Sequence, residues 1–263
     1  MIRLAVLGPS GRMGRRVIQL AAGRDDVQVH AAIDRADSPL IGQVLDDGVV
    51  VTSNLETGLA GCDAYIDFTT PEACAQAARA AMHAGGVAAV VGTTGLDPAT
   101  VSELDRLAAR APVLVAANFS LGVNLVIALA ETAARALGPE FDFEVMELHH
   151  RHKRDAPSGT ALALAAALAA GRGQALADVL RTARSGEVGP RPDGEIGVVA
   201  LRGGEIAGEH TALLIGDSER IELTHRAGSR DLFAAGALRA ATWLAGRPPG
   251  HYAMRDVLGL PPS

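Results

Sequence analysis

The sequence has few aromatic residues and almost no lysine. Aromatic residues make up 3% of the 263 residues, although hydrophobic residues make up 48%. A core must therefore be built mainly from Ala, Val, Leu and Ile, which is common where helices alternate with parallel strands. A chain of this length can form one large or two small domains with sizeable cores. The composition favours an α/β fold.

Cysteines and long apolar runs are also scarce. The two cysteines, Cys62 and Cys74, have neither metal-site nor redox-motif spacing, so we expect no disulfide framework and a reducing compartment. No apolar run reaches the roughly 18 to 20 residues that cross a bilayer. The N-terminal MIRLAVLG lacks the basic leader and cleavage site of a signal peptide. We expect a cytoplasmic protein with no membrane partner.

Positive charge is in deficit. The chain has 24 Lys and Arg against 30 Asp and Glu, a formal net charge of −6. Nucleic-acid-binding proteins usually carry a basic balance or an extended basic stripe, so we expect no nucleic-acid partner. Nearly all the positive charge is arginine, because Lys153 is the single lysine of the sequence, and it lies beside His149, His150 and His152.

Short apolar runs alternate with helical patterns from residue 2 to about residue 120. This alternation is typical of βαβ units, and it predicts a Rossmann-like parallel sheet in a dinucleotide-binding domain over residues 1–120. The strand-like runs are 2–8, 27–34, 64–68, 87–95 and 112–120, and the helical patterns are 12–23, 71–85 and 98–110.

The pattern changes after residue 120. Strand candidates follow one another without helices between them, which predicts a second, α+β domain with an exposed sheet over residues 121–229. Within this domain Phe141, Phe143 and Val145 alternate at period two, as in a half-exposed strand. A final helical pattern at 232–246 is expected to return, so that residues 230–263 complete the first domain. The later strand candidates are 196–202, 209–216 and 219–226.

A glycine loop follows the first strand. Gly8, Gly11 and Gly14 have the spacing G-x-x-G-x-x-G rather than the commoner G-x-G-x-x-G. Such glycines permit a tight turn and let the backbone approach a pyrophosphate at a helix N-terminus. Asp34 ends the second strand 26 residues beyond Gly8, where a carboxylate binds an adenosine ribose, and Arg35 suits a ribose 2′-phosphate. The alternative is a glycine turn and a capping aspartate with no ligand.

Two further loops follow later strands of the predicted sheet. Ligands of open α/β sheets bind at the carboxyl ends of the strands, and the small residues, hydroxyls and amide of these loops suit a nicotinamide-ribose wall. Ordinary loops would have the same composition. The residues are Gly92, Thr93 and Thr94 in the first loop, and Ala116 to Phe119 in the second.

The histidine segment, HHRHKRDAPSGTA, has four interpretations. Three close histidines suggest a metal site, but the arginines and the lysine between them oppose a divalent cation, so we expect no metal. A nucleic-acid contact needs a longer basic run. A solvated basic strand end without a role is the third interpretation. An anion-binding and proton-donating site is the fourth, and it accounts for the most features.

The fourth interpretation depends on spacing and on the following helix. His149 and Lys153 are four residues apart, so they share a face in a strand or in a helix, whereas His150 and His152 point elsewhere. Ser158 is the expected N-cap of a helix over about 159–170, and the free N–H groups that follow it suit a carboxylate. A lysine, unlike an arginine, also releases its proton readily.

Seven motifs together closely resemble bacterial 4-hydroxy-tetrahydrodipicolinate reductases, also called dihydrodipicolinate reductases. They are GPSGRMG, DFTTPE, GTTG, AANFSLGVN, ELHHRHKRDAPSGTA, GEIAGEHTA and HRAGSR. The resemblance implies a cytoplasmic homotetramer of the lysine and diaminopimelate pathway, with a second domain for substrate binding and tetramerisation. It implies that NADH and/or NADPH reduces a cyclic dicarboxylate imine. A reductase of another small carboxylate and a non-catalytic dinucleotide sensor are the alternatives.

The resemblance also assigns residues. It makes His149 the proton donor and Lys153 a second donor, and it places His150, Gly159 and Thr160 against the substrate carboxylates. Pro9 departs from the family pattern, because it lacks the backbone N–H that a small residue offers to a phosphate. The implied cofactor contacts are Gly8, Pro9, Ser10, Gly11, Arg12, Met13, Asp34, Arg35, Gly92, Thr93, Thr94, Ala116, Ala117, Asn118 and Phe119.

Overall fold

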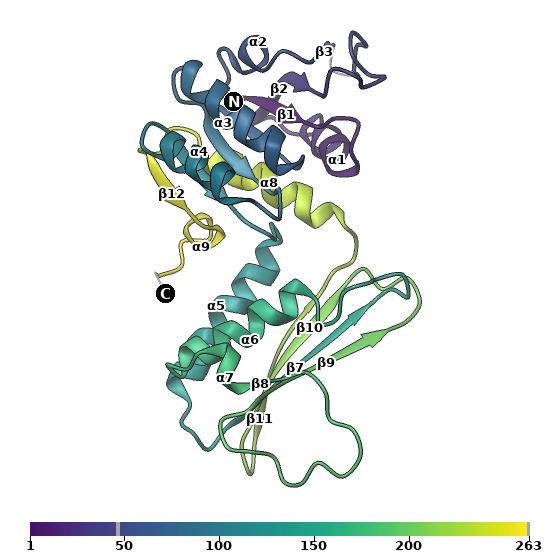
Figure 1. The fold of residues 1–263 in the computed structure, drawn as a ribbon, viewed down its shortest axis with the longest axis vertical. Coiled ribbons are helices and arrows are strands. Elements are labelled where there is room, and N and C mark those ends of the chain that lie inside the picture. The colour runs from purple at the N-terminus through teal and green to yellow at the C-terminus, as the bar shows by residue number, and fades with distance from the viewer. Residues whose placement is uncertain (46–47, 262–263) are drawn as a thin grey trace. The chain divides into compact units, whose positions relative to one another are not determined.

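The computed structural model describes residues 1–45 and 48–261, and the chain forms two compact units (Figure 1). Unit 1 consists of Met1–Leu121 and Asp231–Ser263, and unit 2 of Gly122–Arg230. That unit 1 binds the cofactor and unit 2 the substrate remains a prediction at this point. No helix among the described residues is long and apolar enough to cross a membrane.

A seven-stranded parallel sheet forms the centre of unit 1 within the described part of the chain. Its strand order is β12-β6-β5-β4-β1-β2-β3, so the order reverses between β1 and β4. This is the strand order of doubly wound dinucleotide-binding folds, with one strand added at the edge. The predicted Rossmann-like sheet is confirmed. The strands are β1 Ile2–Leu7, β2 Val27–Ile33, β3 Val51–Thr52, β4 Ala64–Asp67, β5 Ala88–Val91, β6 Pro112–Val115 and β12 Gly250–Tyr252.

Helices cover both faces of this sheet. Buried side chains of α1 and α8 pack on one face, and those of α3 and α4 on the other. Pro71 and Pro98 stand at the start of α3 and α4, where a missing N–H costs nothing. The helices are α1 Arg12–Ala21, α2 Leu55–Leu59, α3 Pro71–His83, α4 Pro98–Ala108, α8 Asp231–Leu244 and α9 Met254–Val257.

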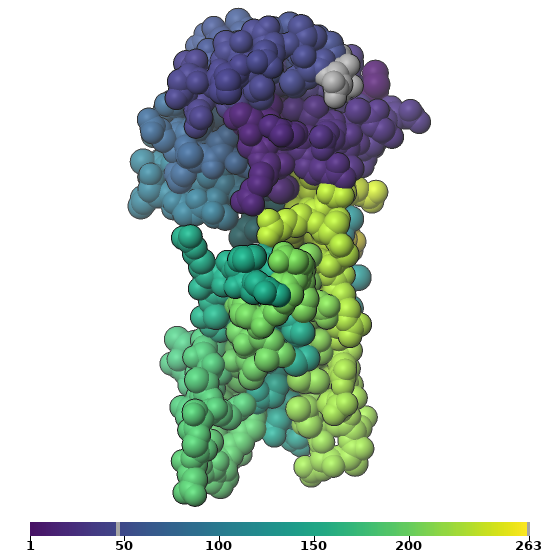
Figure 2. Space-filling model, turned by 90° about the vertical axis from the view of Figure 1, so that its right-hand side faces the viewer, coloured from purple at the N-terminus to yellow at the C-terminus, as the bar shows by residue number. Residues whose placement is uncertain are grey.

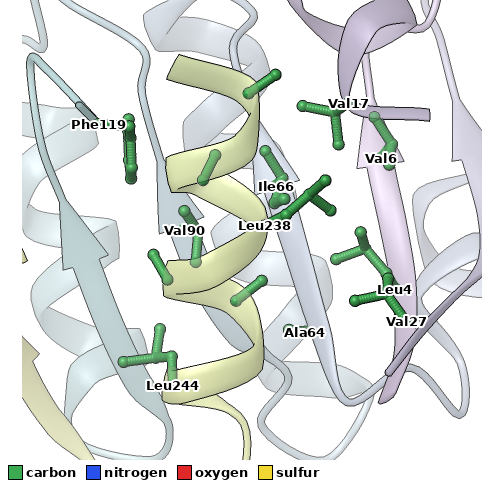
Figure 3. Packing of buried hydrophobic residues seen from close by; sticks show 14 of the residues in the cluster. Leu4, Val6, Val17, Val27, Ala64, Ile66, Val90, Phe119, Leu238 and Leu244 are labelled. Carbon is green, nitrogen blue, oxygen red and sulfur yellow. The ribbon is translucent and has the colours of Figure 1, made fainter. Parts of the chain in front are cut away.

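The returning helix α8 completes the core of unit 1. Leu238 is fully buried and points from α8 towards the strands that carry Leu4 and Ile66 (Figure 3). A Cβ on Gly236 would lie 1.8 Å from the Phe119 carbonyl oxygen, so this glycine lets the helix approach the loop after β6. Figure 2 shows the N-terminal segment, in purple, packed against residues of the 50–100 segment, in blue. The last long helix of the described chain thus packs within unit 1.

Unit 2 has a mixed sheet, whose described strands have the order β11-β10-β7-β9-β8. β10 is antiparallel to β7 and β11, whereas β9 is parallel to β7 and β8. Buried residues of α5 and α6 pack on one face, which confirms the predicted α+β arrangement. The elements are α5 Leu121–Ala136, β7 Asp142–His149, α6 Gly159–Gly171, α7 Leu176–Val179, β8 Leu180–Arg181, β9 Ile196–Arg202, β10 Glu209–Ile215 and β11 Arg220–Arg226.

β7 positions the candidate site, because its side chains alternate strictly between the two faces of the sheet. Phe143 and Val145 are buried in the core of unit 2, as the period of two predicts. The same inward set continues with Glu147 and His149, both buried. A carboxylate and an imidazole therefore occupy positions where the earlier part of the strand places apolar side chains.

Several predicted strands are longer than the observed ones. The run 87–95 contains a strand only over Ala88–Val91, and the run 112–120 only over Pro112–Val115. In both runs the remaining residues form the loops at the carboxyl edge of the sheet, where candidate cofactor residues lie. The short strands β3, β8 and β12 were not predicted, because two or three residues at a sheet edge carry no local periodic signal.

Candidate active site

The glycine loop of unit 1 begins with a β-turn. Gly8 has φ +70°, a conformation that favours glycine, and its carbonyl accepts a hydrogen bond from the Gly11 N–H at 2.9 Å. Pro9 is the second residue of this turn, where its fixed φ is favoured. The N–H that Pro9 lacks is not needed by the turn, so the departure from the family pattern leaves the loop intact.

Gly14 brings α1 close to the end of β1. A Cβ at this position would lie 2.2 Å from the Gly8 carbonyl oxygen and 3.1 Å from that of Leu7. The cap at Gly11 contributes no side-chain hydrogen bond to the first turn of α1. No N-cap side chain therefore occupies the backbone N–H groups in the first turn of α1. A helix start of this kind can bind a pyrophosphate.

Asp34 connects the end of β2 to the glycine loop. Its Oδ2 accepts from the Ser10 N–H at 3.2 Å and from the Ser38 hydroxyl at 2.8 Å, and its Oδ1 accepts from the Arg35 N–H at 3.0 Å. Burial acts to raise the pKa of Asp34, but these hydrogen bonds outweigh burial and lower it. Arg35 is exposed and pairs with Asp37 at 3.1 Å. The carboxylate is thus ionised and held beside the turn.

A cavity of about 530 Å³ opens beside these residues, at the point where the strand order reverses. Ligands of doubly wound sheets bind at such a switch point. The cavity brings together five of the predicted cofactor residues: Gly8, Ser10, Gly11, Asp34 and Arg35. It is also lined by residues to which the sequence assigned no role: Ser53, Leu55, Phe68, Thr69, Thr70, Ala73 and Gln76.

The loop after β4 is the part of this cavity that sequence reasoning missed. It contains Phe68, Thr69 and Thr70, within the motif DFTTPE. This loop follows the carboxyl end of the strand next to β1. Ligands of open α/β sheets bind at the carboxyl ends of the strands, so this loop has the same signal as the loops at 92–94 and 116–119.

A buried carboxylate holds this loop against the next one. Asp67, at the end of β4, accepts hydrogen bonds through Oδ1 from the Thr69 N–H at 2.8 Å, the Thr69 hydroxyl at 2.6 Å and the Thr93 hydroxyl at 3.2 Å. Burial raises the pKa of Asp67, although these hydrogen bonds oppose the rise. Thr93 is itself buried, so its side chain supports the loop.

The other predicted cofactor residues are not among those that line the cavity, although some of them contact its lining. Phe119 is almost fully buried, and its ring makes an edge-to-face contact with Phe68 at 5.5 Å. Gly92 lies against that Phe68 ring, since a Cβ on it would be 2.0 Å from Cε1. Pro9 is buried, Met13, Ala116 and Asn118 are partly buried, and Arg12, Thr94 and Ala117 are exposed.

In unit 2, Glu147 lies at the centre of the histidine site. Its carboxylate is fully buried and accepts the hydrogen bond of His149 Nδ1. Arg202, from the neighbouring strand β9, donates to both carboxylate oxygens at 2.9 Å. The Ser158 N–H donates to Oε1 at 3.0 Å. One carboxylate thus joins the end of β7, the end of β9 and the start of α6.

Charge and burial compete at this pair. Burial acts to raise the pKa of Glu147, but the hydrogen bonds from Arg202, His149 and Ser158 outweigh it, so the pKa is lowered. Burial lowers the pKa of His149. The hydrogen bond and the charge of Glu147 raise it and offset part of this effect, whereas the charges of Lys153 and Arg202 lower it further. The net direction for His149 is downward.

The structure places Lys153 near His149 and pairs it with a carboxylate. Its ammonium donates to both oxygens of Asp155 at 2.9 Å, and its side chain is largely buried. The charge of Lys153 contributes to lowering the pKa of His149. The other two histidines make separate contacts: His150 Nε2 lies 3.1 Å from an Arg230 nitrogen, and the exposed His152 lies 3.7 Å from Glu205.

The start of α6 has the predicted cap. The Ser158 hydroxyl accepts from the Ala161 N–H at 3.2 Å and lies 3.0 Å from His210 Nε2. Gly159 is exposed, and a Cβ on it would meet nothing within 4 Å. Open space in front of the first helical residues suits a carboxylate, which the helix dipole also favours. Among the described residues, no group of three or more His, Cys, Asp and Glu is arranged to hold a metal.

Three residues of this site were missed from the sequence: Glu147, Arg202 and His210. Burial lowers the pKa of His210 to about 4, helped by the neighbouring His149, so it is neutral near pH 7. The one available signal was the period of two in β7, since it places Glu147 in the buried set. Arg202 in β9 and His210 in β10 are far from Glu147 in the sequence, and only the pairing of their strands with β7 brings them beside it. No local sequence pattern reveals this pairing.

A doubly wound sheet with a glycine turn at its switch point defines unit 1 as a dinucleotide-binding domain, and unit 2 adds a histidine–carboxylate site. Together they define the class of two-domain nicotinamide-dependent oxidoreductases. The family profile "Dihydrodipicolinate reductase, N-terminus" matches residues 2–119, and "Dihydrodipicolinate reductase, C-terminus" matches residues 122–258. The chain belongs to the dihydrodipicolinate reductase family.

Individual relatives agree with this assignment. The 4-hydroxy-tetrahydrodipicolinate reductase of Anaeromyxobacter dehalogenans is 46% identical over 267 residues, covering 99% of this chain and 98% of the relative. That of Myxococcus xanthus is 49% identical over 271 residues, with the same coverage. The solved structure of the dipicolinate-bound dihydrodipicolinate reductase from Paenisporosarcina sp. TG-14 has a TM-score of 0.80 at 24% identity, covering 97% of this chain and 98% of that one. At that identity the likeness concerns the fold.

Proposed function

We propose that the protein is an NAD(P)H-dependent reductase that converts 4-hydroxy-tetrahydrodipicolinate into tetrahydrodipicolinate in lysine and diaminopimelate biosynthesis. The single observation that carries this proposal, within a chain of this family, is the arrangement of unit 2: a histidine held by a buried carboxylate, a lysine beside it and an open helix start. These are a proton donor and an anion site, which the reduction of a dicarboxylate imine requires.

The reaction loses water from the 4-hydroxy precursor and then adds one hydride and one proton to the ring. When bound, NAD(P)H supplies the hydride. Hydride addition leaves negative charge on the ring, and His149 donates the proton that quenches it. General acid catalysis of this kind is typically worth about 10²–10⁴-fold in rate. Lys153 acts as a second donor and offsets the negative charge of the substrate.

The substrate carboxylates bind at the start of α6 and beside it. Gly159 and Thr160 offer backbone N–H groups in the first turn of a helix whose N-cap, Ser158, is fixed. His150, held near Arg230, adds a further donor. Positive groups hold two carboxylates that would otherwise repel each other.

The cofactor binds in unit 1, at the cavity beside the glycine turn. The first turn of α1 and residues Gly8 to Met13 hold the pyrophosphate, and Asp34 accepts from the adenosine ribose. Because Arg35 is exposed beside Asp34, a 2′-phosphate can also be accommodated, and both NADH and NADPH are cofactors. The loops at 92–94 and 116–119 form the wall of the nicotinamide ribose.

The proposal extends to assembly and location. We place the protein in the cytoplasm as a homotetramer in which unit 2 supplies the contacts. In support, Val199 and Leu201 on β9 are exposed apolar side chains on one face of the mixed sheet, and exposed apolar side chains that share a face mark interaction surfaces. Sedimentation of the purified protein as a monomer at micromolar concentration would contradict this part.

Variants of the two donors test the site. His149→Ala and Lys153→Ala are each expected to lower kcat at least about tenfold with cofactor binding unchanged, because each removes a proton donor and no part of unit 1. Steady-state kinetics on freshly prepared imine, with a fluorescence titration of NADH, measure both quantities. Parental kcat in either variant would remove the role of that residue. A reductase of another small carboxylate would turn over a different substrate and not this imine, which substrate profiling would reveal. A dinucleotide sensor would turn over no substrate.

A further inference from the structure

The carboxylate of Glu147 is shared between the general acid and the substrate-binding helix. Through Oε2 it accepts from His149 Nδ1, and through Oε1 it accepts from the Ser158 N–H at 3.0 Å. Its side chain is fully buried, so no solvent molecule competes for these positions. A displacement of this one group would therefore disturb both halves of the site.

Arg202 makes an ionised carboxylate possible at this depth. It donates to both oxygens of Glu147 at 2.9 Å, and its Nη2 also donates to the Asp155 carbonyl at 2.7 Å. A buried carboxylate without such a partner would take up a proton rather than remain charged. With Arg202 in place, the Glu147 carboxylate stays ionised and can only accept hydrogen bonds. Nδ1 of His149, which contacts it, must therefore carry the hydrogen of their hydrogen bond.

The other nitrogen of the ring is left free of side chains on one side by a glycine. A Cβ on Gly208 would lie 3.0 Å from His149 Nε2 and 3.3 Å from Cδ2. Gly208 has φ +151°, which side chains rarely adopt. The ring of His210 lies at 5.1 Å, edge to face with that of His149, and it contacts Ser158 through Nε2.

We propose that Glu147 is the positioning residue of this site: it holds His149 with Nδ1 as the donor to the carboxylate, so that Nε2 delivers the proton to the substrate, and through Ser158 it fixes the start of α6. The inference rests on the proposed reductase function. It adds the atom that gives the proton and the group that selects it. Lys153, Arg202 and His210 also face His149, and the negative charge of Glu147 acts against them by raising the pKa of His149.

Glu147→Gln removes the charge and preserves the shape. The amide oxygen can still accept from the Ser158 N–H, but the amide nitrogen then faces His149 Nδ1 and Arg202, which are donors. Nδ1 must become an acceptor, and the neutral ring then carries its hydrogen on Nε2. The protonated ring also loses its carboxylate partner, so the pKa of His149 falls.

Two kinetic results are expected. At neutral pH, kcat should fall at least about tenfold, with the NADH dissociation constant unchanged. The decline of kcat that accompanies deprotonation of His149 at rising pH should also move to lower pH, by about one pH unit or more. A merely structural role would lower the melting temperature and leave the position of this decline where it is in the parent. Such a result would overturn the inference.

Glu144→Gln is the matched control. Glu144 is on the same strand and pairs with Arg184 at 2.7 Å and Arg191 at 3.3 Å, and no contact joins it to His149 in the described structure. This variant loses an arginine-paired carboxylate of β7 and should keep the parental pH profile. A shift of equal size in both variants would contradict the specific role of Glu147.

A spectroscopic measurement on the parent protein avoids dependence on the variant's folding. In ¹⁵N-histidine-labelled protein, the imidazole signals that disappear in His149→Gln identify the ring of His149. Nδ1 should carry a hydrogen across the pH range in which the ring is neutral, and a neutral ring protonated at Nε2 alone would overturn the inference. An inactive parent with Nδ1 protonated would contradict the reductase proposal and leave the positioning by Glu147 intact.

Discussion

Replacing Gly14 by alanine tests whether the close approach of α1 to β1 forms the cofactor site. The added Cβ would lie 2.2 Å from the Gly8 carbonyl oxygen, 2.7 Å from the Gly8 carbonyl carbon and 3.1 Å from the Leu7 oxygen. All three are backbone atoms, so no side chain can rotate away. Ordinary contact between heavy atoms begins near 3.5 Å, and α1 must therefore move on the order of 1 Å.

Such a movement has a cost in stability and in binding. Overpacking of this kind typically costs about 1–3 kcal/mol of unfolding free energy. The start of α1 and the Gly8–Gly11 turn would separate, although in the proposed site both offer N–H groups to the same phosphate. Because a misplacement of about 1 Å can cost roughly 10²-fold, we expect the NADH dissociation constant to rise at least about tenfold.

Fluorescence titration with NADH and thermal unfolding measure these two effects. Gly23→Ala is the control, since it follows the other end of α1 and its Cβ would lie 4.0 Å from the nearest atom, the Leu20 oxygen. This control should bind NADH as the parent does. If Gly14→Ala keeps the parental dissociation constant and melting temperature, the close approach does not constrain the loop and the reasoning is wrong.

Two further predictions concern buried polar groups. Asp67→Ala should raise KM for NADH and leave KM for the imine unchanged, because the donors of Thr69 and Thr93 lose their acceptor in unit 1; steady-state kinetics with each substrate varied in turn would show it, and an equal change in both constants would contradict it. His210 has its pKa lowered to about 4 from 6.5, so its effect on stability is absent above pH 6.5 and becomes increasingly unfavourable as the pH falls towards 4. The unfolding free energy of the parent should therefore decrease between pH 7 and pH 5, and in His210→Gln this decrease should be smaller by up to roughly 2 kcal/mol. Denaturant unfolding at the two pH values measures it, and an equal decrease in both proteins would exclude His210 as a cause.

Much of the fold follows from local patterns in the sequence. The glycine turn, the Pro71 and Pro98 helix starts and the Ser158 cap are dictated by residues a few positions apart, and the structure has all of them. The alternation in β7 likewise needs only a period of two. The pairing of β12 with β6 cannot be read in this way, because it joins residues more than 130 positions apart through a strand of three residues.

In the candidate site, too, some residues are predicted from local patterns and others are placed only by the pairing of distant strands. Asp34 and the histidine segment stand out because their residue types suit a ligand, and the sequence predicts them without knowledge of their neighbours. The partners of the buried carboxylates depend on strand register. His149 lies opposite Arg202 in the β7–β9 pair, and Glu147 lies opposite His210 in the β10–β7 pair. Only the fold determines these pairs, and they decide which histidine nitrogen is free.

The most direct test of the central claim is the initial rate of NADH and NADPH oxidation by the purified protein, measured with and without freshly generated 4-hydroxy-tetrahydrodipicolinate. We predict oxidation that depends on the imine and saturates with it, with NADH and with NADPH. A parent protein that binds NADH but oxidises neither cofactor when the imine is present would contradict the assignment.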